Sequence, residues 1–118
     1  MSSIIIDKPS QLTKTVTKTV SDTAALTDNF STIKYDNGVS NVVFTLPQDS
    51  DIAFPIGSWM PIRRTGSGNL NIIGGTGATI ESEFGDVELQ LTGVDGFFGF
   101  IEKVEADTWL VSGSLREA

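Results

Sequence analysis

The stretch GSWMPIRRTGSGNLNIIGGTGATIE, residues 57–81, decides the fold class of this chain. It contains three short runs of β-favouring residues, 59–64, 70–73 and 78–80, separated by two glycine-rich segments. Glycine adopts positive φ without a Cβ clash, so we expect positive φ at five turn positions: Gly66, Gly68, Gly74, Gly75 and Gly77. Such a density of glycine is entropically costly unless strands hold it on both sides. The stretch therefore predicts a β meander inside a packed domain.

Strand signals continue on both sides of this meander. Asn37-Gly38 lies between β-rich runs at 33–35 and 42–46, which predicts a β-hairpin. Residues 86–92 alternate cleanly, and their apolar positions Val87, Leu89 and Leu91 are expected to point inward.

The rest of the chain adds two further strands and little helix. Runs at 97–104 and 108–112 read as strands, residues 21–28 have enough helical character for one turn, and residues 113–118 read as a polar tail. Turns this short favour antiparallel neighbours. The predicted fold is therefore all-β, an antiparallel β-sandwich or jelly-roll-like barrel, with one domain over residues 21–118 and an extended N-terminal arm.

Residues 1–20 differ in residue pattern from the domain that follows. Pro9 interrupts an apolar start, and residues 12–20 then alternate strictly between threonine and a mixture of lysine and aliphatic residues. Alternation with β-branched residues indicates a strand, either at a sheet edge or in an arm that adds to another subunit's sheet. The residues expected to anchor such an arm are Ile4, Ile5, Ile6, Leu12, Val16 and Val20, with Lys14 and Lys18 supplying charge complementarity.

Composition narrows the function classes. The 118 residues contain no cysteine and no histidine, which removes thiol chemistry, the commonest general base and the commonest metal ligand. We therefore expect no enzymatic activity, no cofactor and no metal. No apolar run is long enough to span a bilayer, and the first residues lack the features of a signal peptide.

Charge is uneven along the chain. Residues 1–20 carry three lysines and one aspartate, a net charge of +2. The remaining residues carry a net charge of −9, so the whole chain has a net charge of −7. An acidic body argues against nucleic acid as a partner, because phosphates would be repelled. The acidity can serve solubility alone, or the weakly basic arm can dock on an acidic neighbour.

Few other side chains suggest a site. Trp59 and Trp109 are interpreted as core or sheet-end packing, with sugar stacking as the alternative for an exposed indole. Arg63 and Arg64 place one guanidinium on each face of a strand, either at a rim or against a partner or glycan. Asp49 and Asp51 lack the further ligands of a calcium loop and are interpreted as solvated carboxylates.

Five segments together resemble a small β module of tailed-bacteriophage virion proteins: TLP (45–47), FPIG (54–57), IRRTGSGNLNI (62–72), GTGATI (75–80) and IEKVEADTWLVSGSL (101–115). The module occurs in capsid decoration (cement) proteins and in tail-fibre or spike chains. The resemblance covers roughly residues 26–115 and leaves the first 20 residues outside it.

The resemblance implies a structural, non-catalytic protein of the virion, made in the host cytoplasm. Since the module and one short arm account for the whole chain, we expect a decoration protein on the outer capsid surface that bridges neighbouring subunits. Its implied partners are the major capsid protein and further copies of itself, as a dimer or trimer, with no nucleic acid and no membrane. The alternative is a tail-fibre tip that binds a host-surface glycan or receptor through Trp59 and the glycine loops.

Overall fold

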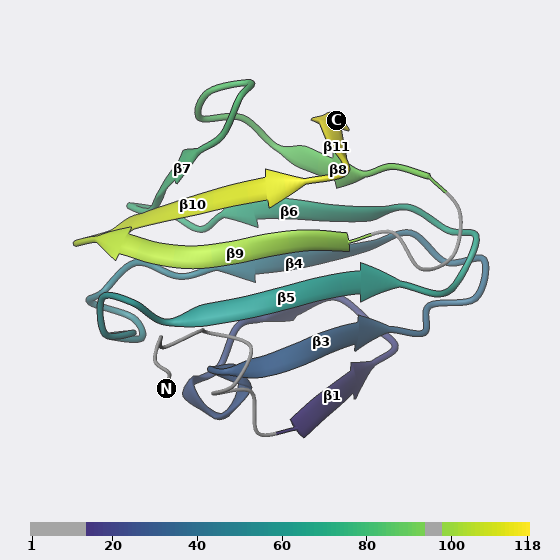
Figure 1. The fold of residues 1–118 in the computed structure, drawn as a ribbon, viewed down its shortest axis with the longest axis horizontal. Coiled ribbons are helices and arrows are strands. Elements are labelled where there is room, and N and C mark those ends of the chain that lie inside the picture. Colours follow the sequence, from purple (N-terminus) through teal and green to yellow (C-terminus); the bar gives the residue numbers. More distant parts are fainter. Residues whose placement is uncertain (1–13, 94–97) are drawn as a thin grey trace, which may run out of the picture.

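The computed structural model describes residues 14–93 and 98–118, which form two β-sheets packed face to face (Figure 1). Sheet A contains, in spatial order, β1 (Lys14–Lys18), β3 (Ser31–Tyr35), β5 (Trp59–Arg64), β9 (Phe98–Glu105), β10 (Thr108–Gly113) and β7 (Thr79–Glu81). Sheet B contains β11 (Leu115–Glu117), β8 (Leu89–Leu91), β6 (Leu70–Gly74), β4 (Val42–Leu46) and β2 (Asp22–Thr23). The expected helical turn is a 3-10 helix, η2, at Leu26–Asp28. The predicted all-β sandwich is confirmed.

The first six strands pass alternately between the two sheets. In sheet A, β1, β3 and β5 are parallel neighbours, and in sheet B so are β2, β4 and β6. Each of the strands β2 to β5 therefore serves as the crossover between two parallel strands of the other sheet. In Figure 1 the chain runs rightward along β3 and β5 in front and leftward along β4 and β6 behind, which makes a right-handed coil. This is the hand that twisted strands favour.

Several predicted local pairings are wrong. β3 and β4 do not pair around Asn37-Gly38, and β5, β6 and β7 do not form a meander, because each turn carries the chain to the opposite sheet. Each short turn here joins strands of opposite sheets, and the intervening strand supplies the crossover length that a parallel pair needs. The antiparallel pairs among the described strands are β5–β9, β9–β10, β6–β8 and β8–β11. The expected polar tail contains β11.

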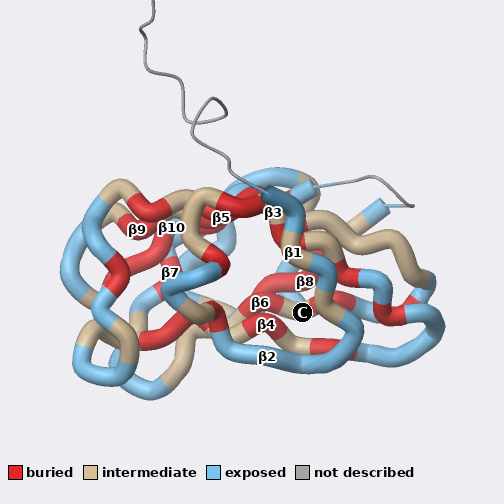
Figure 2. Tube along the Cα trace, turned by 90° about the horizontal axis from the view of Figure 1, so that it is seen from below, coloured by how far each residue is buried: buried red, intermediate tan, exposed pale blue. Residues whose placement is uncertain are grey.

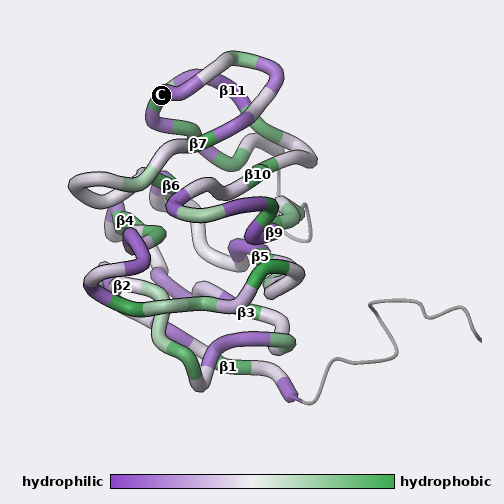
Figure 3. Tube along the Cα trace, turned by 90° about the vertical axis from the view of Figure 1, so that its left-hand side faces the viewer, coloured by the Kyte–Doolittle hydropathy of each residue, from purple (hydrophilic) through white to green (hydrophobic). Residues whose placement is uncertain are grey.

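The core lies between the two sheets. Alternate residues of β3 and β4 are buried, and Figure 2 shows buried positions running through both layers. Figure 3 views the layers end-on, with β2, β4 and β6 on one side and β3, β5 and β9 on the other. The largest fully buried apolar side chains are Trp109, Tyr35, Phe44, Ile33, Leu46, Met60, Ile62, Leu70, Ile72, Ile80 and Leu89. The predicted inward positions Leu89 and Leu91 are both buried, and Val87 is partly buried and packs against the core.

In the glycine-rich turns, glycine is required mainly because the backbones of two turns approach each other closely, and less because of unusual φ angles. Of the five glycines expected at positive φ, Gly77 alone has it, at 85°. A Cβ on Gly68 would lie 2.0 Å from the backbone oxygen of Ser40, and one on Gly66 would lie 2.4 Å from that of Gly38. The turn after β5 thus presses on the turn after β3, and both Ser67 N and Gly68 N donate to Gly38 O, at 2.7 and 2.9 Å.

Substitution of Gly68 by alanine should destabilise the fold by about 2–3 kcal/mol, because backbone must move to admit the methyl group. Urea unfolding followed by circular dichroism measures the loss. Gly75→Ala is the control, since its Cβ would meet a side-chain methyl group, Thr45 Cγ2, at 3.3 Å and no backbone atom closer than 3.5 Å, and should cost less than about 1 kcal/mol. Equal losses in the two variants would show that the contact between turns is not the cause.

Candidate functional site

The expected N-terminal arm is described only in its second half. Ile4, Ile5, Ile6 and Leu12 lie outside the described residues. Residues 14–18 form β1, which pairs in parallel with β3 and occupies one edge of sheet A. Lys14 is exposed, Val16 is half-buried against the core, and Val20 is 67 % exposed. The described part of the arm is therefore an edge strand of the chain's own sheet.

Lys18 is paired within the domain. Its ammonium lies 2.7 Å from Asp22 Oδ2 and 3.2 Å from Asp28 Oδ2, and 5.8 Å from the centre of the Phe44 ring. Burial alone would lower the pKa of Lys18, but the hydrogen bonds to Asp22 and Asp28 outweigh it and raise the pKa. The hydrogen bond from Lys18 lowers the pKa of Asp22. The charge of Lys18 thus fixes β1 to the segment 22–28.

The outer face of sheet A carries a row of aromatic side chains. Met60, Ile62 and Ile101 point between the sheets, so the alternate residues of β5 and β9 point outward. The outward Trp59 stacks on Phe100, with ring centres 6.1 Å apart and planes 7° apart. Phe98 continues the row 6.2 Å from Phe100. Phe98 and Phe100 are 43 % and 39 % exposed, which makes this the main aromatic surface of the described residues.

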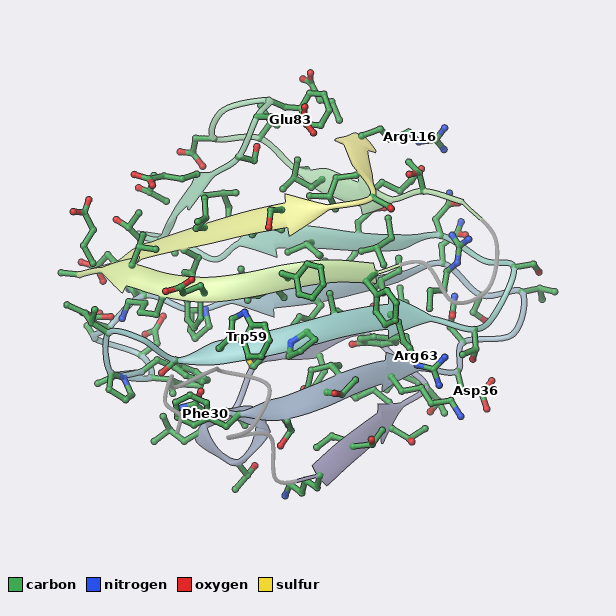
Figure 4. The ribbon with its side chains drawn as sticks, viewed as in Figure 1. Phe30, Asp36, Trp59, Arg63, Glu83 and Arg116 are labelled. Atoms are coloured by element: carbon green, nitrogen blue, oxygen red, sulfur yellow. The ribbon has the colours of Figure 1, made fainter. Side chains whose placement is uncertain are left out.

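Arg63 and Arg64 do lie on different faces of β5. Arg63 is outward, opposite Phe98 on one side and Lys34 on the other. Figure 4 shows Trp59 and Arg63 towards opposite ends of β5. Arg64 instead donates through Nη2 to the carbonyl oxygen of Gly93. Of the two arginines, Arg63 is thus the one available to a partner on the outer face.

The sequence does not predict an ion pair that the structure shows between the buried Lys103 and the partly exposed Asp49. Lys103 is 1 % exposed, and its ammonium donates to Asp49 Oδ1 at 2.5 Å and to Phe54 O at 2.9 Å. The hydrogen bond from Lys103 lowers the pKa of Asp49, so the interpretation of Asp49 as merely solvated is wrong. The sequence feature that indicates the burial of Lys103 is the alternation of β9, which places Lys103 on the same side as the buried Ile101.

The described residues contain neither a cluster of potential metal ligands nor a helix that could span a membrane. None of them form a group of three or more acidic, histidine or cysteine side chains that could hold a metal ion. Among the same residues, no helix has the length and apolar character that crossing a membrane requires. The arrangement presents two candidate binding surfaces, a sheet edge at β1 and an aromatic outer face on sheet A.

The fold places the chain among two-sheet all-β sandwiches whose first strands coil between the sheets. Comparison with protein-family models, with curated proteins and with solved structures gives no match.

Proposed function

We propose that this chain is a non-enzymatic bacteriophage capsid decoration (cement) protein that binds the outer shell and bridges neighbouring capsid subunits. The observation that carries the proposal is the position of β1. This strand is an edge strand of sheet A, pairs with β3, and begins eight residues after Ile6, the last of the apolar residues Ile4, Ile5 and Ile6. The five segments that resemble phage virion modules support the same class of protein.

The mechanism is mechanical. An edge strand presents unpaired backbone donors and acceptors, so a strand of the major capsid protein can extend sheet A beyond β1. The exposed Lys14 complements an acidic neighbour there. Each contact is modest, but copies bound around a shell add through avidity and hold subunit seams against the pressure of packaged DNA.

Binding to heads assembled from the major capsid protein of the same virion tests the proposal. Deletion of residues 1–13 retains every described strand, so we expect a folded protein that no longer sediments with heads. Ile5→Asp in the full chain should weaken binding at least tenfold. Ile56→Asp is the matched control, because Ile56 is 69 % exposed in the loop before β5. Head binding unchanged by the deletion and by Ile5→Asp would refute the role of the arm.

A tail-fibre tip that binds a host-surface glycan is the second candidate, favoured by the stacked Trp59, Phe100 and Phe98. Aromatic faces stack on sugar rings in many binding sites. A glycan array probed with the chain and with Trp59→Ala separates the two functions. Micromolar binding that Trp59→Ala abolishes, together with no binding to heads, would favour the tip.

A further inference from the structure

The aromatic row on the outer face of sheet A forms a flat apolar strip. The ring planes of Trp59 and Phe100 differ by 7° and those of Phe100 and Phe98 by 23°, with ring centres 6.1 and 6.2 Å apart. Pro61 lies on the same side of β5 and is nevertheless buried, which indicates that neighbouring rings lie across it. Flat aromatic faces of this kind stack on the C–H faces of sugar rings.

A strained turn holds the backbone of Trp59 in place. Phe30 has a φ of 57°, which is an outlier for a bulky side chain. Its N–H donates to Trp59 O at 2.9 Å, and Asn29 Oδ1 accepts from Trp59 N at 3.1 Å. Figure 4 shows Phe30 and Trp59 at the end of the sheet where β3 and β5 begin. Backbone strain concentrates at binding sites, so this turn indicates a preorganised surface.

Two cations without a partner lie at the other end of the strip. Lys34 and Arg63 are directly opposite each other on adjacent strands, and Arg63 is also opposite Phe98. Like charges so placed destabilise a sheet. The ion pairs between described residues involve neither cation, nor the exposed Asp36 just past β3. In a chain with 15 acidic and only 8 basic residues, this unpaired cationic end favours an anionic ligand.

We propose that the outer face of sheet A binds an acidic oligosaccharide, a sugar chain that carries carboxylate groups. The sugar rings stack on Trp59, Phe100 and Phe98. One carboxylate accepts two parallel hydrogen bonds from the Arg63 guanidinium, and the Lys34 ammonium adds a second positive charge. The inference rests on the glycan alternative and names its class of sugar. It is compatible with capsid attachment, because the edge of β1 and the outer face of sheet A are separate surfaces.

The chemistry of this face favours an acidic sugar over other occupants. A purely apolar partner, or a neutral sugar, would cover Lys34 and Arg63 without compensating their charge, and burial of an unpaired charge is costly. An acidic sugar supplies an apolar ring face and a negative charge in one molecule. Exposed hydroxyl groups lie beside both parts of the surface, since Thr17 is opposite Lys34 and Ser112 is opposite Phe100. They can exchange hydrogen bonds with sugar hydroxyls.

Calorimetric titration of the full-length chain with paired sugars tests the proposal. The probes are sialyl-lactose and oligomers of mannuronic, glucuronic and galacturonic acid, each compared with its carboxyl-reduced counterpart. At least one acidic sugar should bind ~10-fold or more tightly than its reduced form, because a hydrogen bond to a charged group contributes about that factor. The preference should shrink at high salt, which screens the charges.

Two variants separate charge from stacking. Arg63→Gln should weaken binding of the acidic sugar ~10-fold and leave the reduced form unaffected, so the preference disappears. Trp59→Ala should weaken both forms by a similar factor, because stacking does not depend on the carboxylate. Arg116→Gln is the matched control, since it removes one cation from β11 of sheet B and should change neither affinity. Circular dichroism confirms that each variant is folded.

Four outcomes would overturn the proposal. Equal affinity for acidic and reduced sugars would leave glycan binding standing and remove the acidic class. A preference that both Arg63→Gln and Lys34→Gln leave intact would place the anion elsewhere. A stable dimer that Phe100→Ser dissociates would assign the face to a second copy of the chain. Absence of binding to every sugar at millimolar concentration would remove the glycan alternative as well, whereas the head-binding assay would still decide the role of the arm.

Discussion

Replacement of Trp109 by alanine should lower the free energy of unfolding by about 3–5 kcal/mol, the range for removing a large side chain from a packed core. The indole is fully buried and meets the Phe54 ring edge-on at 5.0 Å. Its Nε1 donates to Pro47 O at 3.0 Å, so alanine also leaves a buried acceptor unpaired. Urea unfolding followed by far-ultraviolet circular dichroism measures the change.

Two further variants separate the causes of that loss. Trp109→Phe keeps an aromatic ring but loses the hydrogen bond to Pro47 O, and should cost less than alanine. Trp59→Ala removes the same side chain from the outer face, where no cavity forms, and should cost about 1 kcal/mol. Equal losses for Trp109→Ala and Trp59→Ala would contradict the packing role assigned to Trp109.

The sequence predicted strands well because burial on one face leaves a local pattern. Leu89 and Leu91 alternate with polar residues, and this alternation identifies the buried side without knowledge of any neighbour. Pairing between strands leaves no such local record. Asn37-Gly38 has the composition of a hairpin turn, and Gly38 does have a φ of 56°, yet the chain crosses there from sheet A to sheet B.

The glycine-rich turns show the same limit of prediction from sequence. Gly68 is required because the backbone of Ser40 lies against it, a contact between two turns that are adjacent only once the coil has formed. Sequence reasoning could assign glycine to a turn but could not identify the neighbour that excludes a side chain.

The candidate surfaces were predicted in part. The sequence predicts Trp59 and Arg63 as possible contact residues, but their neighbours Phe100 and Phe98 depend on the register between β5 and β9, which are far apart in sequence. Phe98 and Phe100 were assigned to a strand with no indication of which side they face. For Lys18, the alternation suggested a charge open to a partner, whereas the fold brings Asp22 and Asp28 against it.

Loss of Asp49 should destabilise the protein more than loss of Lys103, although the two form one ion pair. In Asp49→Asn the ammonium of Lys103 stays buried with neutral amide oxygens as its acceptors and its charge uncompensated. In Lys103→Met the remaining carboxylate is 37 % exposed and can be hydrated, while the methionine fills the space above Trp109. The loss of unfolding free energy should be roughly two- to threefold larger for Asp49→Asn. The reverse order would show that Lys103 acts by packing.

The ion pair between Lys103 and Asp49 should also contribute to the loss of stability at acidic pH. Because Lys103 holds the pKa of Asp49 below its ordinary value of 3.8, this carboxylate stabilises the fold above that pH and loses its contribution as the pH falls through its lowered pKa. Wild-type stability should therefore decline below about pH 4. In Lys103→Met the decline should be shallower, with Asp22, whose pKa Lys18 lowers, supplying what remains. Urea midpoints between pH 7 and pH 2 measure both slopes, and parallel slopes would show that Asp49 gains nothing from Lys103 in the folded state.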